Sequence, residues 1–87
     1  MAKAYVLIKT RVGELHSVRD DLARHEHITS ADVIIGPYDV IALVEADDYN
    51  TIGTVVLSFV HELSGVENTV TCLVIDPLQA GAENPGL

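Results

Sequence analysis

The sequence contains no tryptophan, and it has a single cysteine, a single methionine and a single phenylalanine among its 87 residues. Because one thiol cannot pair within the chain, the lone Cys72 excludes a disulfide-stabilised scaffold. Basic residues are scarce too: 5 Lys and Arg stand against 13 Asp and Glu, for a formal net charge of -8. A chain this acidic repels phosphate backbones, so we expect no direct binding to nucleic acid.

Long hydrophobic runs are missing as well. No uninterrupted apolar stretch approaches the roughly 20 residues that cross a bilayer, and the first residues lack the basic and apolar segments of a leader. We therefore expect a cytoplasmic protein with no membrane partner. The hydrophobic content is nevertheless 48 %, which is too high for a disordered chain. A domain of only 87 residues buries a modest share of its surface, so help from a partner subunit is expected.

Two segments have apolar residues at helical spacing. In the first, Leu15, Val18 and Leu22 recur with charged residues between them, which predicts a surface helix. In the second, Asp48 is the expected N-cap and Gly65 the expected C-terminal stop. Six apolar residues between them follow one helix face: Ile52, Val55, Val56, Phe59, Val60 and Leu63.

Four apolar, β-branched segments are expected to form strands, at residues 4–8, 28–35, 38–46 and 67–76. Only Gly36 and Pro37 separate the second strand from the third, so these two strands should be antiparallel neighbours. The order of elements is then βαββαβ. That order is typical of the α+β, ferredoxin-like fold, in which two helices cover one face of a four-stranded antiparallel sheet.

The second face of this sheet is expected to be apolar, because several strands carry apolar residues on both alternations. In the third strand, for example, Val40 and Val44 alternate with Ile41 and Leu43. An uncovered face of this kind should not stay in water. Packing it against the same face of a second chain would give a two-fold dimer with a closed core between the sheets.

The run Gly36-Pro37-Tyr38-Asp39 is the most informative motif in the chain. A turn that delivers a tyrosine and an acid to the start of a strand places polar groups at the rim of a sheet, where a small polar ligand can bind. The alternative is a plain hairpin turn, in which Asp39 accepts hydrogen bonds from the amides of its own turn.

Two later runs join this motif at matching spacing, Ala46-Asp47-Asp48 and Leu63-Ser64-Gly65-Val66-Glu67-Asn68-Thr69-Val70-Thr71. Over residues 4–76 the pattern resembles the effector-binding (RAM) domain of the leucine-responsive/asparagine-responsive (Lrp/AsnC) transcription regulators, in its stand-alone form. Full-length members carry an N-terminal helix-turn-helix. This chain begins directly at its first expected strand, so we expect no DNA-reading part.

The resemblance implies a homodimeric α/β barrel that assembles further into an oligomer of dimers, with an amino acid bound where dimers meet. It also implies the ligand-binding residues, which are Gly36, Pro37, Tyr38, Asp39, Thr69 and Thr71. Residues 1–76 would then be the ligand-binding and oligomerisation domain, and residues 77–87, which begin with Pro77, a C-terminal tail. A full-length regulator of the same family is a possible partner in mixed oligomers.

A free amino acid needs an acceptor for its ammonium group and donors for its carboxylate. Asp39 or Asp47 offers the acceptor, while threonine hydroxyls and backbone N–H groups offer the donors. Tyr38 offers an aromatic wall with a polar tip.

Two other functions stay open at this point. One is a small dimeric α/β-barrel enzyme of the oxygenase type, and the other is an assembly module without a ligand. The enzyme would need a histidine or asparagine in the pocket between sheet and helices. Both candidates, His16 and His61, fall off the apolar helix stripes, so we expect no enzyme and no catalytic residue.

We also expect no metal and no cofactor. His25 and His27 supply only two nitrogens, and no third ligand is near them in the sequence. His61 is expected at the end of the second helix, facing the negative end of the helix dipole. Cys72 alternates with Val70 and Val74, which predicts a thiol packed in the core.

Overall fold

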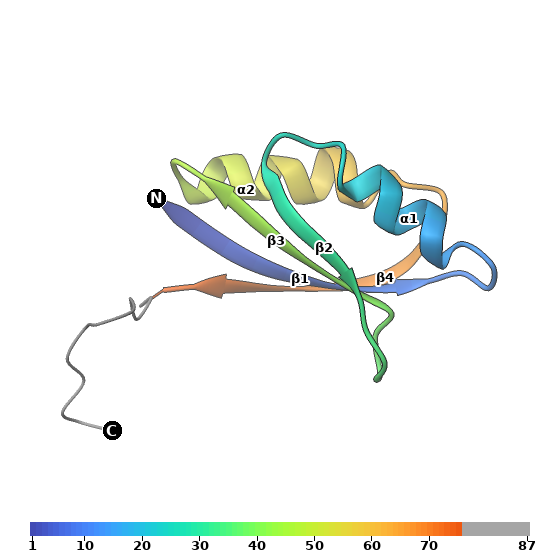
Figure 1. Cartoon of the computed structure of the whole chain (residues 1–87). Coiled ribbons are helices and arrows are strands. Elements are labelled where there is room, and N and C mark those ends of the chain that lie inside the picture. The colour runs from blue at the N-terminus through green and yellow to red at the C-terminus, as the bar shows by residue number, and fades with distance from the viewer. Residues whose placement is uncertain (76–87) are drawn as a thin grey trace, which may run out of the picture.

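A computed structural model describes residues 1–75, and Figure 1 shows one sheet with both helices on the same face. The elements are β1 (Ala2–Thr10), α1 (Leu15–Leu22), β2 (Ile28–Val33), β3 (Val40–Ala46), α2 (Tyr49–Val55), the π-helical turn η1 (Val56–Val60) and β4 (Val66–Val74). The four strands are antiparallel, in the order β2-β3-β1-β4. The expected ferredoxin-like βαββαβ fold is therefore confirmed. The expected tail, residues 77–87, lies outside the described residues.

The hydrophobic core lies between the helices and the two central strands. Alternate residues of β1 and β3 point to this side, and they are small or β-branched, which lets the helices approach closely. The helix stripes predicted from the sequence supply the other half of the core. Its largest fully buried side chains are Val6, Ile8, Val18, Leu22, Val40, Val44, Ile52 and Val60.

Asp48 begins α2 as predicted. Its Oδ1 atom accepts a hydrogen bond from the backbone N–H of Thr51 at 2.7 Å, and this bond lowers the pKa of the Asp48 carboxyl below its ordinary value. The helix then widens, because the N–H of His61 donates to the carbonyl of Val56 at 2.9 Å, which is an i to i+5 bond. No helix within residues 1–75 is long and apolar enough to span a bilayer.

Gly65 does not end the second helix, so that prediction is wrong. The helical segment ends at Val60, and Gly65 is buried against α1. A Cβ atom built on Gly65 would lie 2.6 Å from Cγ2 of Val18 and 2.8 Å from Cβ of Glu14. The glycine is therefore required by the close approach of the chain to α1, and not by a helix cap.

The connection between β2 and β3 is longer than predicted. The strands end at Val33 and begin again at Val40, so residues 34–39 form a loop in place of a two-residue turn. The N–H of Ile34 donates to the carbonyl of Asp39 at 2.9 Å, and the N–H of Asp39 donates to the carbonyl of Ile8 at 2.9 Å. The loop projects beyond the sheet, on the side away from the helices (Figure 1).

The face of the sheet that the helices leave uncovered is apolar, as expected, and we call it the open face. Its rows follow from the strand register, which places Leu43 and Cys72 on either side of Tyr5. The next row joins Ile41, Leu7 and Val70 in the same way. Cys72 is exposed on this face. The prediction that Cys72 packs in the core of the chain is therefore wrong, because its alternation faces away from the helices.

Candidate functional site

Asp39 is joined to the end of β1 by two hydrogen bonds. The backbone N–H of Thr10 donates to Oδ2 of Asp39 at 2.9 Å, and the Thr10 hydroxyl donates to the same oxygen at 3.1 Å. The backbone bond is the main cause that lowers the pKa of the Asp39 carboxyl below its ordinary value of 3.8, and the hydroxyl and the charge of Lys9 act in the same direction. Asp39 is therefore held in the ionised form.

The alternative was a plain hairpin turn, in which Asp39 accepts hydrogen bonds from the amides of its own turn. The Asp39 carboxylate does not make these bonds. It ties the loop at residues 34–39 to a different strand through Oδ2, and its Oδ1 atom takes part in neither bond. Gly36 and Pro37 are exposed, and Tyr38 is half-buried. The loop therefore presents a fixed anionic group at the rim of the sheet, next in sequence to a half-buried tyrosine.

Thr69 and Thr71 lie on β4, which is an edge strand. Their partners in the sheet are Ile8 and Val6 of β1, whose side chains are buried beneath the helices. The two threonines therefore point to the helix side of the sheet, beyond the part that the helices cover. Thr71 is exposed and Thr69 is half-buried, and the Thr69 hydroxyl lies within hydrogen-bond distance of a histidine, His61.

The structure does not bring all six predicted residues into one pocket of a single chain. Asp39 borders a hollow at the end of β1, formed with Thr10, Gly13 and Glu67 among others. Thr69 borders a second hollow, which also includes Glu67. Thr71 borders a third hollow beside α2, with neighbours Tyr49, Ile52, Gly53, Val56, Leu57 and Leu73. Within one chain, Asp39 of the loop and Thr71 therefore border separate hollows.

His61 belongs to this region and was not predicted to. It lies at the helix end, as expected, but its Nε2 atom is 2.9 Å from Oγ1 of Thr69. No helical period in the sequence indicates this contact, because it depends on the π turn at Val56–Val60. Thr10 was missed for a different reason, since it lies 29 positions from Asp39.

The other histidines have structural surroundings. The His25 ring packs against Phe59, with ring centroids 4.6 Å apart and ring planes tilted by 52°. The Nδ1 atom of His27 lies 3.2 Å from the carbonyl oxygen of Glu45. His16 is exposed on α1, so it does not enter the space between helices and sheet. Within residues 1–75 no three His, Cys, Asp or Glu side chains are grouped as metal ligands.

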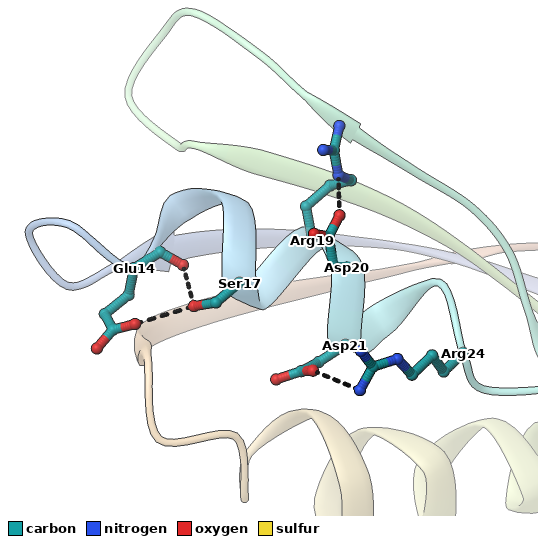
Figure 2. A network of polar contacts seen from close by, with 6 residues as sticks. All are labelled: Glu14, Ser17, Arg19, Asp20, Asp21 and Arg24. Carbon is teal, nitrogen blue, oxygen red and sulfur yellow. Dashed lines mark hydrogen bonds and ion pairs between the residues drawn. The ribbon is translucent and has the colours of Figure 1, made fainter.

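The acids of α1 form surface ion pairs (Figure 2). Arg19 Nε lies 2.8 Å from Asp20 Oδ1, and a terminal guanidinium nitrogen of Arg24 lies 3.2 Å from Asp21 Oδ1. Exposed pairs of this kind contribute little to stability. The two aspartates point to different partners and do not face one another (Figure 2), so they make no acid/base pair.

Comparison with known families gives one match that covers most of the chain. The family described as "Lrp/AsnC ligand binding domain" matches residues 3–82. No curated protein sequence matches the chain.

Among solved structures, TTHA0845 from Thermus thermophilus is 30% identical, with a TM-score of 0.87, and the match covers 91% of this chain and 99% of that one. Escherichia coli AsnC is 16% identical with a TM-score of 0.81, over 90% of this chain and 54% of AsnC. A transcriptional regulator from Neisseria meningitidis, NMB0573, solved in complex with L-Met, is 18% identical with a TM-score of 0.73, over 99% of this chain and 55% of the regulator. At such identities the two regulators show a shared fold alone, and this chain spans about half their length.

Proposed function

The chain belongs to the family of Lrp/AsnC ligand binding domains, and from that membership we propose that it is an effector-binding and oligomerisation module whose effector is an amino acid. The observation that carries this proposal is the pair of open polar surfaces on one small sheet. The ionised Asp39 offers an acceptor for an ammonium group at the rim. Thr69 and Thr71 offer hydroxyl donors for a carboxylate on the edge strand.

A site between chains accounts for the separation of these two surfaces. Because Asp39 of the loop and Thr71 border different hollows, a ligand held by both would contact them in neighbouring subunits. The six residues of the proposed site are Gly36, Pro37, Tyr38, Asp39, Thr69 and Thr71. The L-Met bound by the Neisseria regulator is of the chemical class that such a site would take.

The open face supplies the primary contact between subunits in this proposal. Tyr5, Leu43 and Cys72 form one exposed or half-buried row across it, and two such faces packed together would form a closed apolar layer. Homodimers built in this way would associate further at the effector sites. Residues 1–76 then form the binding and assembly domain, and residues 77–87 a tail.

Regulation follows from the same assembly. An effector that binds only where dimers meet shifts the balance between assembly states by its differential affinity for them. A full-length cytoplasmic regulator of the family would read this balance by forming mixed oligomers through the same faces. In this proposal the protein acts by binding and not as an enzyme. His16 and His61 are both exposed, and within residues 1–75 no titratable side chain is buried in the core beneath the helices.

The proposal is tested by thermal shift and light scattering with each of the twenty amino acids. We expect one or a few of them to raise the melting temperature and to change the assembly size. Thr71→Val should abolish this response, because a methyl group replaces the hydroxyl donor. Thr54→Val is the matched control, since Thr54 is an exposed threonine of α2 whose hydroxyl bonds the carbonyl of Asn50. A response to no amino acid would overturn the proposal.

A further inference from the structure

The side chains of His61 and Thr69 meet between the end of η1 and strand β4, with Nε2 of the imidazole 2.9 Å from Oγ1 of the hydroxyl. Both border the same surface hollow, together with Val66, Glu67 and Asn68. Thr69 is one of the hydroxyls that the proposed function assigns to the effector, so any role of His61 at this site rests on that proposal. The contact matters because a hydroxyl has only one proton to donate.

The direction of this hydrogen bond decides what Thr69 can offer to a ligand. If Nε2 of His61 carries a proton, it donates to Oγ1, and the hydroxyl proton of Thr69 is free to point at the ligand. If Nε2 carries no proton, it accepts the hydroxyl proton, and Thr69 then offers only lone pairs. A ligand carboxylate is an acceptor and needs the first arrangement.

We propose that His61 is a positioning residue of the effector site, which sets the Thr69 hydroxyl to donate to the effector carboxylate and makes affinity rise as the imidazole gains its proton. In the imidazolium form both ring nitrogens carry protons, so Nε2 must donate. Histidine side chains ordinarily change charge between about pH 5 and 8. The neutral ring can also carry its single proton on Nε2, and this tautomer still donates to Thr69. Loss of the second ring proton therefore weakens effector binding without abolishing it.

The charges near the hollow also make binding of a carboxylate more favourable when His61 is protonated. Glu67 of β4 borders it, and Glu62 follows His61 in the chain. The other bordering side chains, Val66 and Asn68, carry no charge. A carboxylate that approaches Thr69 therefore meets negative charge, and a protonated His61 offsets this repulsion at short range.

The π turn explains why His61 lies at this position. The N–H of His61 closes the i to i+5 bond to Val56 at 2.9 Å, so the last helical turn contains one residue more than an α-helical turn. This extra residue rotates the position at which His61 leaves the helix. Single π turns of this kind occur frequently at functional sites.

The test measures the dissociation constant between pH 5.5 and 8.0, using as probe the amino acid that gives the largest thermal shift at pH 7. For the unchanged chain we expect affinity to weaken about three- to tenfold as the pH rises, which is the scale of one hydrogen bond. His61→Gln should show a flat profile, because its amide nitrogen can donate to Thr69 at every pH. His16→Gln is the control, since His16 is exposed on α1, and it should keep the original profile.

Two results would overturn the role of His61: a flat profile for the unchanged chain, or a pH dependence that persists in His61→Gln. In either case the proposed function stands, because an amino acid still binds. If no amino acid binds at any pH, the proposed function itself fails, and the role of His61 fails with it. The two failures are therefore distinguishable.

Discussion

Asp39 and Thr10 are joined twice, since a single carboxylate oxygen accepts both the backbone N–H at 2.9 Å and the hydroxyl at 3.1 Å. The two residues lie 29 positions apart, and the contact fixes the loop after β2 to the last residue of β1. The stability of this loop is therefore linked to the ionisation of one side chain.

Asp39→Asn is expected to lower the melting temperature at neutral pH. The folded chain lowers the pKa of Asp39 below its ordinary value of 3.8, so the carboxylate stabilises the fold above that value. This contribution is lost as the pH falls through the lower folded pKa. Thermal unfolding of both chains from pH 7 to pH 2.5 should show the difference between them closing at the acid end.

The control for Asp39→Asn is Glu26→Gln, because Glu26 is an exposed acid in the connection between α1 and β2. Its melting temperature should follow that of the unchanged chain at every pH. The electrostatic account would be contradicted if the difference in melting temperature between Asp39→Asn and the unchanged chain stayed constant down to pH 2.5. That result would point to lost packing instead.

Gly65→Ala is expected to destabilise the fold by about 1–3 kcal/mol, which is typical of overpacking. The added methyl group would lie 2.6 Å from Cγ2 of Val18, and the β-branched valine has little freedom to move. Chemical denaturation measures the loss. Gly53→Ala is the matched control, because nothing lies within 4 Å of its added Cβ, and it should stabilise α2 by about 0.5–1 kcal/mol. Equal effects of the two substitutions would refute the assignment of Gly65 to close packing.

Leu43→Lys is expected to dissociate the proposed dimer, because it places a charge in the middle of the open face, beside Tyr5. Light scattering should show a fall in mass to that of a single chain. Cys72 lies on the other side of Tyr5 and gives a second measurement, since its thiol should react slowly with a thiol reagent in the dimer and rapidly after dissociation. The control is Val12→Lys, in the exposed loop after β1. It should change neither the mass measured by light scattering nor the reaction rate of the Cys72 thiol. A monomeric unchanged chain would contradict the assembly.

Much of the fold could be predicted because its signals are local. The helix stripes, the N-cap at Asp48 and the order of elements each depend on residues close in sequence. The connection between β2 and β3 was predicted wrongly because Ile34 and Ile35 extend the apolar pattern of the strand. In the structure Ile34 closes the loop through Asp39, and Ile35 is fully exposed.

The errors on Cys72 and Gly65 have a common origin. A period of two residues shows that β4 has two faces, but it does not show which face the helices cover. A glycine after a helix pattern can end the helix or permit a close contact, and only the distance to Val18 decides between these roles for Gly65. Both questions depend on contacts between segments far apart in the sequence.

For the candidate site, the sequence proposes a set of residues but does not indicate how they are arranged. The family resemblance implied Tyr38, Asp39 and the two threonines as site residues, whereas the sheet order places Asp39, Thr69 and Thr71 at different hollows. The contact between His61 and Thr69 depends on the π turn. No periodic pattern in the sequence indicates that turn.

The proposed function is tested most sharply by a titration followed by amide NMR, in which each of the twenty amino acids is added to the labelled protein. We predict that an effector shifts the amide signals of Gly36, Tyr38, Asp39, Thr69 and Thr71 together, although Asp39, Thr69 and Thr71 border three different hollows of one chain. Signals on the outer side of α1 should stay in place. If no amino acid moves these signals, or if the shifts gather on another surface, the interpretation of this chain as an amino-acid effector module is contradicted.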